Sequence, residues 1–170
     1  MDKLKKIKLS NNLLETIRFE KYQKLNNLLE LDLSFNKLKD ITFFAYIELK
    51  ELKSLLLNNN VIVDINIFGE INLKNIIYLD LRNNNISKID VLKKMSIEDI
   101  FHLDISKNPI KSIKPLENLH FKKKIFGFLK VSLDLINFNL QKNIDIMHNI
   151  KLNDWSFYLW LCKFNNIKDI

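Results

Sequence analysis

The sequence predicts an α/β solenoid, a curved stack of repeats with a parallel sheet on its concave side and short helical or 3-10 segments on its convex side. A pattern of apolar residues closed by one asparagine recurs five times, with a constant period of 24 from each asparagine to the next. It is clearest from Ile76 to Ile89, where Leu79 and Leu81 precede Asn84. One repeat buries too little apolar surface to fold alone, so five repeats in one register indicate a stack.

The apolar residues before each asparagine alternate as they do in a strand with one buried face. Leu79 and Leu81 are predicted to point into the stack, and Asp80 to point outward. The chain must then turn, which leaves backbone groups to be satisfied inside the stack. An asparagine amide both donates and accepts hydrogen bonds, so we expect a structural ladder of asparagines. Its members are Asn12, Asn36, Asn60, Asn84 and Asn108.

The five regular repeats cover residues 1–121. Each ends in a return segment whose apolar spacing, as in Tyr46 and Leu49, is typical of a short helical turn. Tyr22 is assigned the same place in the first return segment. We expect the open end of the first repeat either to be masked by self-association or to belong to a longer chain. The repeats begin at Leu4, Leu28, Leu52, Ile76 and Ile100.

The pattern degrades over residues 122–154, which are predicted to hold degenerate repeats. A sixth repeat fits with Phe126 and Phe128 on its strand and Val131 in the asparagine slot. We expect these repeats to continue the same stack.

Residues 155–170 are predicted to form a C-terminal cap. Trp155 and Tyr158 have the spacing of an amphipathic helix, which could cover the last repeat. Two glycines and two prolines are too few for flexible linkers, so we expect one structural domain.

Three segments resemble the intracellular leucine-rich-repeat (LRR) proteins with short repeats: Leu52–Asn60, Leu79–Ile89 and Leu103–Ile110. The segment Trp155–Ile170 resembles the cap of the A-prime protein of the spliceosomal U-two particle. The same group includes the leucine-rich regulator of protein phosphatase one. The repeat spacing also resembles that of bacterial internalins. The resemblance implies an LRR solenoid whose outward strand residues line a concave binding face.

The outward strand residues combine apolar anchors with an acidic centre, in contrast to the positive net charge. Aromatic and arginine side chains are typical interface anchors, so we expect this face to bind another protein, such as a helix or a basic segment. Two structural alternatives stay open: aspartate is a common filler at these strand positions, and the convex side or the degenerate C-terminal part could pack over the aromatic residues. The candidate residues are Glu30, Asp32, Phe35, Leu56, Tyr78, Asp80, Arg82, Phe101, His102 and Asp104.

Catalysis has little support in the sequence. The histidines are His102, His120 and His148, and no Cys–His pair, metal-ligand cluster or glycine-rich phosphate loop accompanies them. We therefore predict a non-catalytic scaffold without cofactor or metal. A ribonucleoprotein component that touches RNA through basic surfaces, and a phosphatase regulatory subunit, are the alternatives.

The net charge of +7 is compatible with an acidic partner such as nucleic acid, or with a compositional bias toward lysine. The longest apolar run, Trp155–Cys162, is shorter than a membrane span requires. Cys162 is the one cysteine, and extracellular LRR proteins usually carry cysteine-bridged caps. We therefore expect an intracellular protein, cytoplasmic or nuclear.

Overall fold

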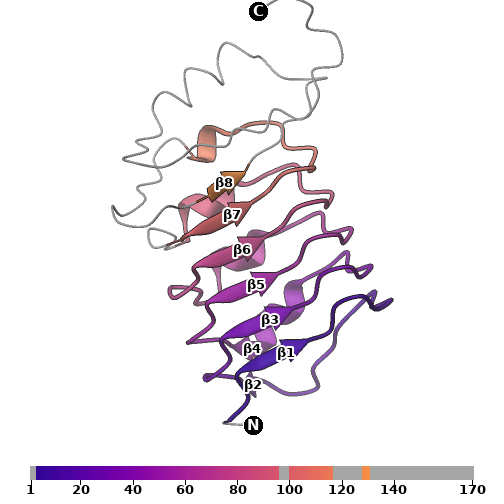
Figure 1. The fold of residues 1–170 in the computed structure, drawn as a ribbon, viewed down its shortest axis with the longest axis vertical. Coiled ribbons are helices and arrows are strands. Elements are labelled where there is room, and N and C mark those ends of the chain that lie inside the picture. Colours follow the sequence, from indigo (N-terminus) through magenta and orange to yellow (C-terminus); the bar gives the residue numbers. More distant parts are fainter. Residues whose placement is uncertain (1–2, 96–99, 117–127, 131–170) are drawn as a thin grey trace, which may run out of the picture.

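The computed structural model describes residues 3–95, 100–116 and 128–130, which form one stack of strands with short helices beside it (Figure 1). The main sheet is parallel, with strand order β1-β3-β5-β6-β7-β8. Figure 1 shows its strands rising one above another from the N-terminus. The strands are β1 (Lys6–Lys8), β3 (Glu30–Asp32), β5 (Ser54–Leu56), β6 (Tyr78–Asp80), β7 (His102–Asp104) and β8 (Phe128–Lys130).

The strand register confirms the predicted period of 24 as far as β7. Leu79 lies opposite Leu103, and the earlier strands pair with the same offset. The last pair differs, because Leu103 lies opposite Leu129, whereas an unchanged period would bring Gly127 to that position. The predicted frame of the sixth repeat, with Phe126 opposite Leu103, was therefore wrong. The predicted cap and the rest of the degenerate segment lie outside the described residues.

The return segments form 3-10 helices in four of the described repeats, as the sequence predicted. They are η1 (Thr42–Tyr46), η2 (Asn66–Gly69), η3 (Asp90–Lys93) and η4 (Lys114–Leu116). In the first repeat the return segment contributes strand β2 (Gln23–Lys24), which pairs in parallel with β4 (Ile47–Glu48). The sequence pattern did not predict this second sheet, because its strands are too short to show alternation.

The return segments complete the core with side chains that recur with the period of the strands. Phe44 and Phe68 meet edge to face, with ring centroids 6.0 Å apart. Tyr22 and Tyr46, which the sequence assigned to return segments, are 55% and 53% exposed. A 3-10 helix has three residues per turn, and in η1 the side chains that reach the core are Phe43 and Phe44 rather than Tyr46. The recurring buried residues are Phe44, Phe68, Leu92 and Leu116.

The buried asparagines join each repeat to the one before it. Asn60 Nδ2 donates to the carbonyl oxygens of Leu33 and Leu57, each at 3.0 Å. Its Oδ1 accepts the backbone N–H of Leu38 at 3.0 Å. One amide thus satisfies three buried backbone groups in two repeats. The same pattern of contacts is made by Asn36, Asn84 and Asn108.

Asn12 makes a different set of contacts. It is exposed, and its Nδ2 donates to Leu9 and Ser10 of its own repeat at 2.9 and 3.2 Å. Leu4 and Leu9 are 39% and 41% exposed, because no described repeat covers them.

Replacing Asn60 with alanine leaves buried backbone groups of two repeats unpaired. We expect the free energy of unfolding to fall by about 3 kcal/mol, measured by urea denaturation. Asn12→Ala is the matched control, and it should cost less than about 1 kcal/mol because water reaches its site. Equal losses in the two variants would contradict the role of the ladder.

In the main sheet, the turn that follows each of β1, β3, β5, β6 and β7 places one residue in the left-handed region. Asn11, Asn59 and Asn83 have φ between 56° and 58°, which asparagine tolerates well. Phe35 occupies the same slot in the second repeat with φ 54°, although its bulky side chain disfavours that conformation. Phe35 is 48% exposed, so burial compensates for the backbone cost only in part.

Replacing Phe35 with asparagine should therefore stabilise the protein. We expect the free energy of unfolding to rise by about 1 kcal/mol, because the left-handed slot then holds a residue that suits it. Urea denaturation measures this change. A loss of stability would mean that the buried half of the Phe35 ring outweighs the backbone cost.

Candidate functional site

The concave face is defined here by the outward residues of the sheet and the residue that precedes each strand. The middle residue of each strand from β3 to β7 is buried, so the residues on either side of it point outward. The first outward row contains Lys6, Glu30, Ser54, Tyr78 and His102. The second row contains Lys8, Asp32, Leu56, Asp80 and Asp104.

A stacked pair of rings lies in the first row. Tyr78 on β6 and His102 on β7 stand at the same register, with ring centroids 4.0 Å apart and planes inclined by 3°. Both residues are half-buried, so each keeps some solvent-accessible surface. Leu56 on β5 is also half-buried and lies opposite Asp80, one strand from Tyr78. The strand positions thus hold two rings and an aliphatic side chain together.

The Tyr78 hydroxyl lies in an environment that disfavours its charged form. Burial raises the pKa of Tyr78 above its usual value, and the carboxylates of Asp80 and Asp104 raise it further. Arg82 acts in the opposite direction. The hydroxyl therefore keeps its proton at neutral pH and can donate a hydrogen bond.

The strand aspartates serve the turn that follows each strand. Asp80 accepts the backbone N–H of Arg82 at 3.0 Å, and Asp104 accepts that of Ser106 at 2.9 Å. Asp80 and Asp104 are only 7% and 3% exposed. The acidic centre predicted from the sequence is therefore corrected: two of its four carboxylates are buried by their neighbours and held by the turn.

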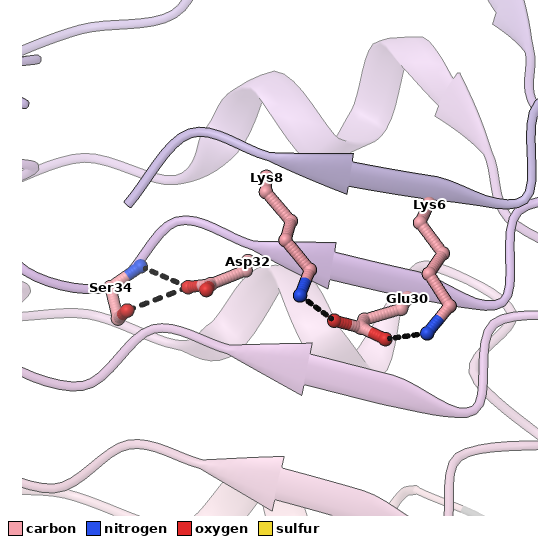
Figure 2. A network of polar contacts seen from close by, with 5 residues as sticks. All are labelled: Lys6, Lys8, Glu30, Asp32 and Ser34. Atoms are coloured by element: carbon pink, nitrogen blue, oxygen red, sulfur yellow. Dashed lines mark hydrogen bonds and ion pairs between the residues drawn. The ribbon is translucent and has the colours of Figure 1, made fainter. Parts of the chain in front are cut away.

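The other two carboxylates are half-buried and paired, as Figure 2 shows. Asp32 Oδ1 accepts both the backbone N–H and the Oγ–H of Ser34, at 3.0 and 2.6 Å. Glu30 takes one lysine ammonium on each oxygen, Lys6 at 2.8 Å and Lys8 at 3.5 Å. The hydrogen bond from Lys6 lowers the pKa of Glu30, opposed by burial, and the charges of Lys6 and Lys8 lower it further.

The remaining predicted residues lie at the edges of this face. Phe101 comes directly before β7 and is half-buried, and Arg82 is half-buried in the turn after β6. Phe35 lies in the turn beyond β3 rather than on the strand. Sequence reasoning did not single out the pairing of Tyr78 with His102, although the period of the repeats could have revealed it.

The comparison with known proteins agrees with the repeat fold. The sequence profile of the family described as Leucine Rich Repeat matches residues 75–95. An internalin (inlF) from Listeria monocytogenes has a similar structure, with a TM-score of 0.52 and 23% identity. The chain is a leucine-rich-repeat solenoid. The match covers 79% of this chain and 42% of the internalin, so this LRR chain spans less than half of that protein.

Two further Listeria monocytogenes structures resemble the chain. Internalin C2 has a TM-score of 0.45 and 18% identity, over 91% of this chain and 80% of that chain. The functional domain of InlJ, which includes a cysteine ladder, has a TM-score of 0.42 and 24% identity, over 69% and 23%. No curated protein matches the sequence of this chain. The resemblance of Trp155–Ile170 to the spliceosomal cap falls outside the described residues and stays a prediction.

The described part of the chain offers neither a metal-binding cluster nor a membrane-spanning helix. Over these residues, no group of three His, Cys, Asp or Glu side chains could hold a metal ion. No helix in the same ranges is both long enough and apolar enough to cross a membrane.

The raised pKa of Tyr78 predicts a loss of stability at alkaline pH. As pH rises, Tyr78 loses its proton near pH 10 in the unfolded chain and at a higher pH in the folded chain. The contribution of Tyr78 to folding stability is therefore complete below about pH 10 and disappears as pH rises through the folded-state pKa. We expect the melting temperature to fall less in Tyr78→Phe than in wild type between about pH 9 and about pH 11. Equal falls in the two proteins would contradict the shift.

Proposed function

We propose that this protein is a non-catalytic scaffold that binds another protein on its concave face. The observation that carries the proposal is the stacked Tyr78–His102 pair, which is half-exposed on a rigid sheet. Aromatic side chains that are held in place and partly exposed are typical anchors of protein interfaces. Leu56, and Ile77 with 42% exposure, extend the apolar surface around the pair.

The backbone of the concave face is already ordered by hydrogen bonds within the stack, and this order favours binding. Ser54 and Tyr78 are fixed by backbone hydrogen bonds from their N–H groups to the preceding repeats, at 3.0 and 2.9 Å. A partner therefore does not have to immobilise the strands, which lowers the entropic cost of association. Solenoids of stacked repeats commonly use such extended surfaces to bind partners.

The finer roles depend on the identity of the partner. A ribonucleoprotein component, a phosphatase regulatory subunit and an intracellular location remain predictions from the sequence. Masking of the first repeat by self-association remains a prediction too. Identifying a partner whose binding requires the concave face would show which of these roles applies.

The test is affinity capture from native lysate with the full chain, read by mass spectrometry. We expect a protein that wild type retains to be lost from Tyr78→Ala/His102→Ala. Tyr22→Ala/Tyr46→Ala is the matched control, because both tyrosines are exposed and lie outside the concave face. Melting temperatures of both variants show that they fold. Equal recovery by wild type and the Tyr78/His102 variant would reject the concave face as the site.

A further inference from the structure

The charged groups that solvent reaches on the concave face are mainly cations. Lys6 and Lys8 lie on β1, with side chains that remain 61% and 64% exposed despite their contact with Glu30. Lys5 and Lys53 precede β1 and β5 and are also exposed. Within the described residues, neither Lys5 nor Lys53 forms an ion pair.

The acids of the same face are engaged within the protein. Glu30 is shared between two lysines, so that cluster keeps an excess positive charge. Asp32 is occupied by Ser34, and Asp80 and Asp104 are buried. The sequence alone suggested a helix or a basic segment as the partner, because it counted all four carboxylates as exposed. Burial keeps Asp80 and Asp104 out of direct contact with a partner, so the side chains that a partner can touch are mainly lysines.

The cations lie within reach of the stacked rings. Neighbouring strands are about 4.8 Å apart, so Lys53 before β5 is one strand from Tyr78, and β1 is three strands, about 14 Å, away. An extended peptide advances about 3.3 Å per residue, so about five residues could join the rings to the lysines. One short segment could therefore contact both.

We propose that the concave face accepts an acidic protein segment that carries an apolar anchor for the Tyr78–His102 pair. The anchor packs against the rings and Leu56, and carboxylates of the segment lie over Lys5, Lys6, Lys8 and Lys53. This inference rests on the proposed function and adds the charge of the partner. Complementary charge speeds association and selects among partners that offer the same anchor.

Protein fits this surface better than nucleic acid does. One face of each ring is already covered by the other ring, at 4.0 Å between centroids, so no base can insert between them. Glu30 and Asp32 are half-buried beside the lysines and would face the phosphates of a strand that crossed β3. A peptide can place its carboxylates selectively, whereas a nucleic-acid backbone carries a charge at every step.

A random peptide display library panned against the full chain tests the proposal, with Tyr78→Ala/His102→Ala as the counter-selection. We expect the enriched peptides to be acidic and to share an aromatic or aliphatic residue. Enrichment of neutral or basic peptides would overturn this inference and leave the proposed function standing. No enrichment on wild type beyond the counter-selected variant would overturn both.

The selected peptides are then titrated by fluorescence anisotropy against charge variants. Lys5→Gln/Lys53→Gln should bind them about fivefold more weakly, because two exposed charges are lost without leaving an acid unpaired. Lys37→Gln/Lys39→Gln is the matched control, since both lysines are exposed and lie in the turn beyond β3. It should keep wild-type affinity. Equal weakening by both variants would show that net charge alone causes the loss of affinity, and this result would overturn the proposal.

The last measurement is the binding of a labelled oligouridine to wild type and to the variants. We expect weak binding to oligouridine that the Tyr78→Ala/His102→Ala variant does not change. Oligouridine binding that is tighter than that of the selected peptides, and is lost in Lys5→Gln/Lys53→Gln, would overturn the proposal in favour of nucleic acid.

Discussion

The rest of the structure depends on the hydrogen bonds of the buried asparagines. Each amide from Asn36 to Asn108 contacts carbonyl oxygens of two repeats, and its oxygen accepts an N–H of the preceding repeat. Slippage by one residue would bury these donors and acceptors without partners, at a cost of several kcal/mol per repeat. The amides therefore hold the strands in one register, and that register places Tyr78 beside His102.

The same turn also determines the charge of the concave face. A backbone N–H at the end of each of three strands needs an acceptor, and a strand aspartate two residues earlier supplies it. This local requirement draws Asp80 and Asp104 into the surface, where their neighbours cover them. The lysines of β1 have no such role and stay exposed. A structural need of the repeat thus leaves lysines as the main exposed charged side chains of the concave face.

Phe35 occupies a position whose left-handed backbone conformation suits asparagine better than phenylalanine. Asparagine occupies the left-handed turn slot in three of the five described repeats, and Lys107 occupies it in another. Phe35 adopts the same φ because the flanking hydrogen bonds fix the turn: its N–H donates to Asn58, and the next N–H donates to Asn59. The register of the stack therefore overrides the preference of a single residue.

The sequence by itself determined the repeat length, the buried leucines, the asparagine positions and the rows of residues across the sheet, because strict periodicity encodes them. It misplaced the sixth strand, where the offset from β7 to β8 grows and no asparagine marks the change. It did not determine which side chains of the return segments are buried, because 3-10 helices and α-helices orient successive side chains differently. Only the tertiary structure decided which charged groups meet solvent and which rings touch. The physical reason is that exposure and pairing depend on neighbours from other repeats, whose side chains cover or engage each group.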